Sequence, residues 1–204
     1  MKTVTLAFTG ASGMPYGVRL LECLIGAGVR VYLIYSQVAQ VVARQEMDLS
    51  LPGRAAEAQA WLSERFHAQP DQLRVFGREE WYAPVASGSN PADAMVICPC
   101  TMGTLAAIAA GLAENLIQRA ADVMLKERRP LILVPRETPL SAIHLENMLN
   151  LARAGAVILP GNPGFYHRPA TVQALVDFVV ARVLDQLGIP NALIPRWGAS
   201  PEGA

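Results

Sequence analysis

The 204-residue sequence has no excess of charge of either sign and no long apolar run. Lysine plus arginine and aspartate plus glutamate number 17 each, so no overall field attracts nucleic acid or an anionic membrane. No segment reaches the roughly 20 apolar residues of a membrane-spanning helix. The start, MKTVTLAFTGASG, turns into glycines without the apolar core of a signal peptide. We therefore expect a cytoplasmic protein whose anion binding is local.

Cysteine is also scarce. Cys23, Cys98 and Cys100 are an odd number without the spacing of a disulfide framework, as is typical of a reducing compartment. No cysteine or histidine cluster lies near Cys98 and Cys100 to complete a zinc site. The aspartates occur singly, unlike the clustered aspartates of a magnesium site. We expect packing roles for the cysteines and no metal.

Short apolar runs alternate with amphipathic stretches along the whole chain, which predicts an α/β fold with a doubly wound, mostly parallel sheet. The length fits one domain, residues 1–204, with an extended C-terminal tail from about residue 188. The predicted strands are Val4–Phe8, Val29–Tyr35, Leu73–Phe76, Ala94–Cys98, Leu131–Pro135 and Ala156–Pro160. The predicted helices are Tyr16–Gly26, Gln37–Met47, Arg54–Phe66, Met102–Leu112, Asn115–Glu127, Ser141–Ala154 and Thr171–Leu187.

The stretch PLILVPRETPL, residues 130–140, is an apolar strand that ends abruptly at Arg136 and Glu137. Open α/β folds bind ligands at the carboxyl ends of their strands, so this charged pair is a candidate for the site. Thr138 and Pro139 also suit the start of a helix. The pair is therefore equally compatible with a solvated loop before a helix.

A glycine turn, GASGMPYG at residues 10–17, follows the first strand. Small residues let the backbone approach a ligand, and the N-terminus of the next helix offers N–H groups to a phosphate. The spacing is not GxGxxG, no GK[ST] follows, and the second strand ends in Tyr35 and Ser36 rather than in an acidic residue. Two interpretations remain: the turn binds a mononucleotide, with Ser12 and Ser36 as hydroxyl donors, or it is purely structural.

Several cations could serve an anion site. Arg119 and Lys126 are seven residues apart and share one helix face, which is also the pattern of a solvated basic stripe. Arg182 lies in an apolar helix, so it either reaches out to water or pairs with an anion such as phosphate. Glu46 and Glu137 are separate carboxylates that could exchange protons if partly desolvated.

These motifs together resemble a known family, the UbiX-type flavin prenyltransferases. The matching stretches are GASGMPYG, Ser36, SGS at 87–89, PCTMGTLA at 99–106, RAADVMLKERRPL at 119–131, RETPL at 136–140 and FYHRP at 165–169. They span nearly the whole chain. The resemblance implies a Rossmann-like flavoprotein fold and a homododecamer with active sites between subunits.

The resemblance also implies roles for individual residues. It places FMN at Gly10, Ala11, Ser12, Ser36, Ser87, Thr101, Met102, Gly103, Thr104, Arg119 and Arg136. It places dimethylallyl phosphate at Tyr166, Arg182, Lys126, Arg136 and Glu137, and gives catalytic roles to Glu46, Glu137, Lys126, Ser12 and Trp81. Family members commonly carry lysine where this chain has Gly103, so one cation of the FMN-binding turn is missing.

The implied reaction is metal-independent and uses reduced FMN as a substrate. Flavin N5 attacks the dimethylallyl carbon as phosphate leaves, and C6 closes a fourth ring. The product, prenylated FMN, would serve a UbiD-type decarboxylase, with ubiquinone biosynthesis as one context.

Two other functions stay open on sequence grounds. An FMN-dependent decarboxylase of the cysteine type predicts a histidine shortly after the second strand, and residues 36–48 contain none. Direct decarboxylation of an aromatic acid is a second version of that function. A carrier that only delivers FMN has no need of a second anion site at Arg182.

Overall fold

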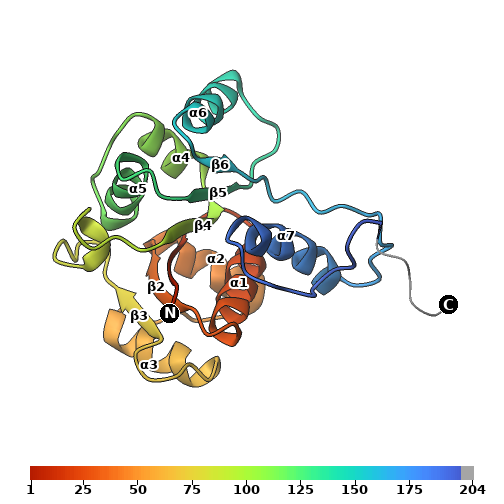
Figure 1. Ribbon diagram of the computed structural model, residues 1–204, viewed down its shortest axis with the longest axis horizontal. Helices are drawn as coiled ribbons and strands as arrows, with labels where there is room; N and C mark the ends of the chain where they lie inside the picture. The colour runs from red at the N-terminus through yellow and green to blue at the C-terminus, as the bar shows by residue number, and fades with distance from the viewer. Residues whose placement is uncertain (199–204) are drawn as a thin grey trace.

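The structure of the protein is a computed structural model, and it describes residues 1–198. Six strands form one sheet in the order β3-β2-β1-β4-β5-β6, and every pair of neighbours runs parallel (Figure 1). The strands are β1 (Thr3–Phe8), β2 (Arg30–Tyr35), β3 (Leu73–Phe76), β4 (Ala94–Cys100), β5 (Leu131–Pro135) and β6 (Val157–Ile158). The helices are α1 (Met14–Gly26), α2 (Gln37–Met47), α3 (Ala55–Arg65), α4 (Met102–Ala109), α5 (Leu116–Lys126), α6 (Ala142–Arg153) and α7 (Val172–Gln186), with a short 3₁₀ turn, η1 (Pro84–Ala86).

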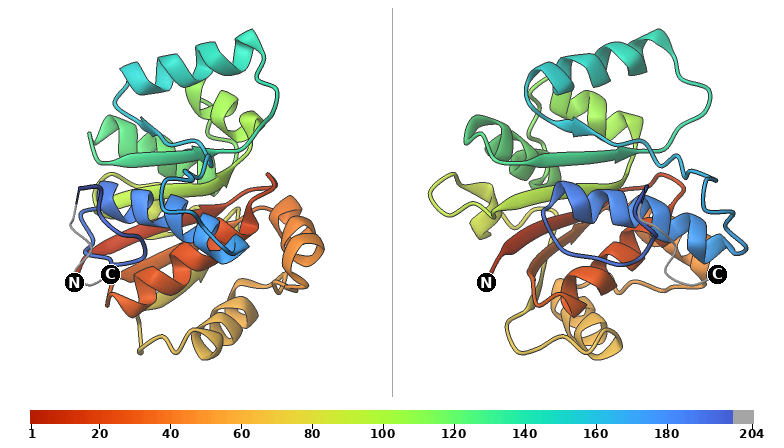
Figure 2. Two further views of the ribbon diagram at one scale, coloured as in Figure 1. Left: turned by 90° about the vertical axis from the view of Figure 1, so that its right-hand side faces the viewer. Right: turned by 45° about the vertical axis from the view of Figure 1, so that its right-hand side comes forward.

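The sheet has a hydrophobic core on each face, because successive side chains of a strand point to opposite faces. In β1, Leu6 and Phe8 belong to the core beneath α1 and α7, while Ala7 belongs to the core beneath α4, α5 and α6. Figure 2 shows the sheet lying between these two helical layers. A sheet that is buried on both faces requires nearly continuous apolar strands, and the sequence supplies them.

The predicted doubly wound fold is confirmed, with the sheet parallel throughout rather than mostly parallel. Shifts occur at the ends of elements. The last predicted strand shrinks to Val157–Ile158, although the N–H groups of Leu159 and Gly161 still donate to the carbonyl oxygens of Leu133 and Pro135 at 2.8 and 3.1 Å. Helix α4 ends at Ala109, before Gly111 with φ 71°, rather than at Leu112. The turn η1, within the loop after β3, was not predicted.

The strand order reverses between β1 and β4, whose carboxyl ends meet at the middle of the sheet. Thr9, only 2% exposed, joins these two ends. Its hydroxyl donates to the carbonyl oxygen of Pro99 at 2.8 Å and accepts the N–H of Thr101 at 2.8 Å. Ligands of open α/β folds bind at such a reversal.

The predicted extended tail, from about residue 188, begins just after α7, which ends at Gln186. Residues 188–198 contain turns and no helix or strand, and they loop back toward α7. Residues 199–204 of the predicted tail lie outside the described residues.

Helix α1 offers a test of this packing. A Cβ at Gly17 would lie 2.3 Å from the carbonyl oxygen of Cys98 and 2.9 Å from the Phe8 ring, whereas Gly26 of the same helix faces open space. Gly17→Ala should destabilise the fold by about 1–3 kcal/mol through overpacking. Gly26→Ala should be neutral or stabilise it by up to about 1 kcal/mol, because alanine is the better helix former. Chemical unfolding of the two variants measures both, and equal stabilities would contradict the close approach of α1 to β4.

Candidate active site

The glycine turn after β1 is closed over by helix α2, which lies across the carboxyl edge of the sheet. A Cβ at Gly10 would lie 2.4 Å from the Cγ1 atom of Val38, so only glycine fits beneath the first turn of α2. Gly13 has φ 110°, which side chains rarely adopt, and starts α1. Ala11 is buried and Ser12 is exposed, so the turn presents its backbone and one hydroxyl outward.

Glu46, at the far end of α2, contacts the same turn. Its carboxylate accepts the N–H of Gly13 at 3.0 Å and the N–H of Met14 at 2.9 Å. A carboxylate suits this position, since the N-terminus of a helix carries partial positive charge. Two of the N–H groups that the sequence offered to a phosphate are therefore taken by Glu46, and a ligand on this turn meets the N–H groups and hydroxyl that precede them.

The hydroxyl groups after β2 and β4 cap helices. Ser36 Oγ accepts the N–H of Ala39 at 3.1 Å, and Thr101 Oγ1 accepts the N–H of Thr104 at 3.1 Å. A capping hydroxyl can still donate its own hydrogen, and the Thr101 hydroxyl donates it to Thr104 Oγ1. Met102 is buried, whereas Gly103 has open space around its Cβ position, so the turn after β4 accommodates a ligand or a longer side chain at 103.

Arg136 reaches the glycine turn from the end of β5, where its Nε donates to the carbonyl oxygen of Ser12 at 3.3 Å. Its neighbour Glu137 is exposed and, within residues 1–198, accepts only the N–H of Thr138. Trp81, 45% exposed, lies in the turn after β3. The carboxyl edge thus brings together the predicted residues of the β1, β2, β4 and β5 loops.

Sequence reasoning missed Tyr16 at this edge. Its ring lies against both Gly13 and Gly161, where an added Cβ would be 2.9 Å and 3.3 Å away. Burial, more than the neighbouring Cys98, raises the pKa of the Tyr16 phenol, so the group keeps its proton as a donor at neutral pH. The two glycines that leave room for the ring are the only sequence signal for the position of Tyr16 at this edge.

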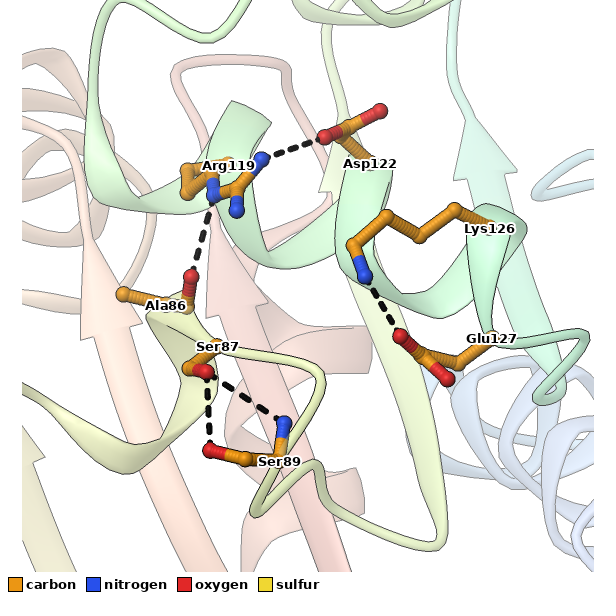
Figure 3. A network of polar contacts seen from close by, with 7 residues as sticks. All are labelled: Ala86, Ser87, Ser89, Arg119, Asp122, Lys126 and Glu127. Atoms are coloured by element: carbon orange, nitrogen blue, oxygen red, sulfur yellow. Dashed lines mark hydrogen bonds and ion pairs between the residues drawn. The ribbon is translucent and has the colours of Figure 1, made fainter.

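A second group of predicted residues lies along the flank of α5 (Figure 3). Arg119 Nε donates to the carbonyl oxygen of Ala86 at 3.0 Å, and its Nη1 pairs with Asp122. At the end of the helix Lys126 forms an ion pair with Glu127, which lowers the pKa of that carboxyl. A Cβ at Gly88 would lie 1.9 Å from Glu127 Oε1, so the SGS loop beside Ser87 packs directly on this pair.

Lys126 and Arg136 lie at opposite ends of β5. Lys126 ends α5 before the strand begins at Leu131, and Arg136 follows directly after Pro135. Five residues of parallel strand span about 17 Å. Within one chain, Lys126 and Arg136 are therefore separated by about the length of this strand.

A third group lies beyond β6. The Tyr166 ring packs edge-on against Trp197 at 5.2 Å between centroids, and both side chains are largely exposed. His167 stacks on Phe178 of α7 and so fixes the loop that carries Tyr166. Arg182 faces solvent on α7 and pairs with Asp185 at 2.7 Å, so its anion within the chain is a carboxylate three residues along the helix. Trp197 was missed by sequence reasoning.

Two cavities of the chain have linings that include none of the residues of these groups. One of about 370 Å³ lies beside the end of β2, where burial raises the pKa of Tyr35 to about 12. Its other lining residues are Gln37, Gln40, Gly53, Ala55, Val75, Phe76, Gly77 and Arg78. Within residues 1–198, no group of three or more histidine, cysteine, aspartate or glutamate side chains is placed to hold a metal. No helix in that range is long and apolar enough to cross a membrane.

Comparison with known proteins assigns the chain to a class. The Flavoprotein family model matches residues 1–184. The chain is 58% identical over 195 residues to the flavin prenyltransferase UbiX of Pseudomonas aeruginosa, and the alignment covers 96% of this chain and 93% of the relative. The protein is a flavoprotein of Rossmann-like fold. Within that class it belongs to the UbiX flavin prenyltransferase family.

Two solved structures resemble it over nearly their whole length. One is AnUbiX (PadA1) in complex with FMN and dimethylallyl pyrophosphate, with 40% identity, a TM-score of 0.86 and 98% of each chain covered. The other is a dodecameric FMN-dependent UbiX-like decarboxylase from Escherichia coli O157:H7, with 42% identity and a TM-score of 0.85. That alignment covers 97% of this chain and 100% of the other.

The contact between Glu46 and the glycine turn can be tested without a ligand. Glu46→Ala should lower the free energy of unfolding by about 1 kcal/mol, because two N–H groups of α1 lose their acceptor. Glu137→Ala, which removes an exposed carboxylate of the same edge, should change it by less than about 0.5 kcal/mol. Chemical unfolding of the apoprotein compares them, and an unaffected Glu46→Ala variant would contradict the capping contact.

Proposed function

We propose that the protein is a flavin prenyltransferase that joins the dimethylallyl group of dimethylallyl phosphate to N5 and C6 of reduced FMN. The observation that carries this function is the 58% identity to the Pseudomonas aeruginosa enzyme over 195 residues, 96% of this chain. The fit of the carboxyl edge to a flavin mononucleotide supports it. This edge offers a turn that only small residues can form, two capping hydroxyls and the Arg136 guanidinium.

The chain's own groups would divide the work of the reaction. Reduced flavin supplies the nucleophilic N5 atom and the C6 carbon. Ser12, Ser36, Thr104 and the backbone of residues 10–12 would hold its phosphate by hydrogen bonds, because the Thr101 hydroxyl donates its own hydrogen to Thr104. Lys126, Arg136 and Arg182 would stabilise the phosphate that leaves the prenyl carbon, with Tyr166 donating a hydrogen bond. Trp81 would offer an aromatic face to the cationic prenyl group.

Proton transfer falls to Glu46 and Glu137 in this scheme. Glu46 already lies on the glycine turn, held by Gly13 and Met14. Glu137 adjoins Arg136, which contacts the same turn. Both carboxylates thus lie at the edge where the flavin is proposed to bind, which makes them candidates for acid–base exchange.

We further propose that each active site is completed by a neighbouring copy of the chain. The support is the separation of Lys126 from Arg136 by the length of β5. Helix α6 adds a second reason, because Ile143 and Leu145 are 69% and 52% exposed and Leu151 is its one buried residue. Such an apolar face is typical of an oligomer interface. A homododecamer like that of the Escherichia coli neighbour would bring the flank of α5 to another copy's carboxyl edge.

A second candidate function is an FMN-dependent decarboxylase of the aromatic-acid or cysteine type. The 42% identity to the UbiX-like decarboxylase of Escherichia coli supports this candidate. Against the cysteine type, residues 36–48 contain no histidine. Delivery of prenylated FMN to a UbiD-type decarboxylase, a role in ubiquinone biosynthesis and the cytoplasmic location stay predictions.

Mass spectrometry separates these functions. Anaerobic incubation of the protein with reduced FMN and dimethylallyl phosphate should give a flavin that is heavier by one five-carbon unit, without added metal. Arg182→Ala should retain FMN and lose most of that product. Unmodified FMN from the wild-type protein would contradict the proposed function, and loss of carbon dioxide from an aromatic acid by the protein alone would favour the second candidate.

Mixed oligomers test the shared site. Lys126→Ala and Arg136→Ala should each be inactive, yet a one-to-one mixture assembled together should regain activity at roughly a quarter of its sites. At those sites the copy that supplies the flank still has Lys126, and the copy that supplies the carboxyl edge still has Arg136. A mixture of Lys126→Ala with Arg119→Ala is the matched control. Both of those residues lie on one flank, so no site is restored. Equal recovery in the two mixtures, or none in the first, would contradict a site built from the flank of one copy and the edge of another.

A further inference from the structure

Asp185 joins three side chains near the end of α7. Its Oδ2 atom accepts from Arg182 Nη1 at 2.7 Å. Its Oδ1 atom accepts from Arg196 Nη1 at 2.8 Å and from Asn191 Nδ2 at 3.2 Å. The side chain of Asp185 is only 15% exposed, whereas those of Arg182 and Arg196 are 49% and 57% exposed. A nearly buried carboxylate thus holds two guanidinium groups that face solvent.

The charges of this cluster do not cancel. Two guanidinium groups remain protonated at any ordinary pH, and one carboxylate neutralises one of them. Each arginine uses only Nη1 on Asp185, and within residues 1–198 its other donors have no hydrogen-bond partner. The cluster therefore presents one net positive charge and unused N–H donors toward solvent, which suits a phosphate.

The same C-terminal segment also reaches Tyr166. Arg196 is followed directly by Trp197, whose ring packs on Tyr166 at 5.2 Å. Asn191 and Arg196 of this segment thus contact Asp185 beside Arg182, and Trp197 contacts the Tyr166 ring. Tyr166 and Arg182 are the two residues proposed above to bind the prenyl phosphate from this part of the chain.

We propose that Asp185 is a positioning residue of the prenyl-phosphate site. It holds Arg182 in one orientation and, through Arg196, anchors the C-terminal segment that packs on Tyr166. This role rests on the proposed function, since it concerns the phosphate of that substrate. An arginine has many rotamers, so a fixed partner reduces the entropy lost when the phosphate binds.

The variant Asp185→Asn tests this role, with Asp177→Asn as the matched control. Asp177 also lies on α7, is 16% exposed and pairs with an arginine, Arg19 of α1, but it has no contact with the C-terminal segment among residues 1–198. Loss of Asp185 also adds a net positive charge, which favours anions. That gain is weak at an exposed, salt-screened site, so the loss of orientation should dominate.

The primary measurement is calorimetric binding of dimethylallyl phosphate to protein loaded with oxidised FMN, which cannot react. We expect Asp185→Asn to bind it about tenfold more weakly than the wild type, a change of about 1.4 kcal/mol, with Asp177→Asn within about twofold. FMN affinity should be unchanged in both variants. In turnover assays the KM for dimethylallyl phosphate should rise about tenfold while kcat changes little, because ground-state and transition-state binding are lost alike.

Other outcomes are equally clear. Binding by Asp185→Asn as tight as that of the control, or absent in the wild type, would overturn the role of Asp185. Wild-type binding without any prenylated product would overturn the proposed function and leave the binding comparison to decide the role of Asp185. If Asp185→Asn does not fold, Arg196→Gln replaces it. This variant should weaken binding by at least about threefold through loss of the anchor, and wild-type affinity would overturn the proposal.

Discussion

The parallel pairing of β1 with both β2 and β4 is the interaction on which the rest of the structure depends. Parallel strands deliver all their carboxyl ends to one edge, and the reversal of strand order at β1 leaves room between two sets of loops. Thr9 holds those central ends together with two hydrogen bonds of 2.8 Å. The glycine turn, both helix-capping hydroxyls and Arg136 reach one place as a result.

The same pairing also separates two of the cations that are proposed to bind phosphate. A helix that returns between parallel strands ends at the opposite edge, and α5 therefore carries Lys126 away from the edge that holds Arg136. The proposed neighbour copy solves a geometrical problem as well as covering the apolar face of α6. In this account, oligomerisation is part of the chemistry, because the cations and the flavin-binding turn come from different chains.

The fold was predictable because its signals are local. Short apolar runs that alternate with amphipathic stretches located all six strands, and Ser36 and Thr101 cap helices as expected. The site was predictable only as a set of residues. Spacing along the chain did not reveal that Glu46 returns to the turn before α1, because this depends on α2 crossing the sheet edge. The ion pair of Arg182 with Asp185 follows from their spacing of three residues on one helix. The contact of Arg196 with the same carboxylate does not, because Arg196 lies in a loop without a periodic pattern.

The central claim is that one phosphate site draws residues from more than one copy of the chain. A structure of the oligomer with FMN and dimethylallyl phosphate bound measures this most directly. The account predicts Arg136 and the glycine turn of one copy on the flavin phosphate or prenyl phosphate, with Lys126 of another copy within hydrogen-bond distance of the same ligands. A complex in which every phosphate contact comes from a single chain would contradict it.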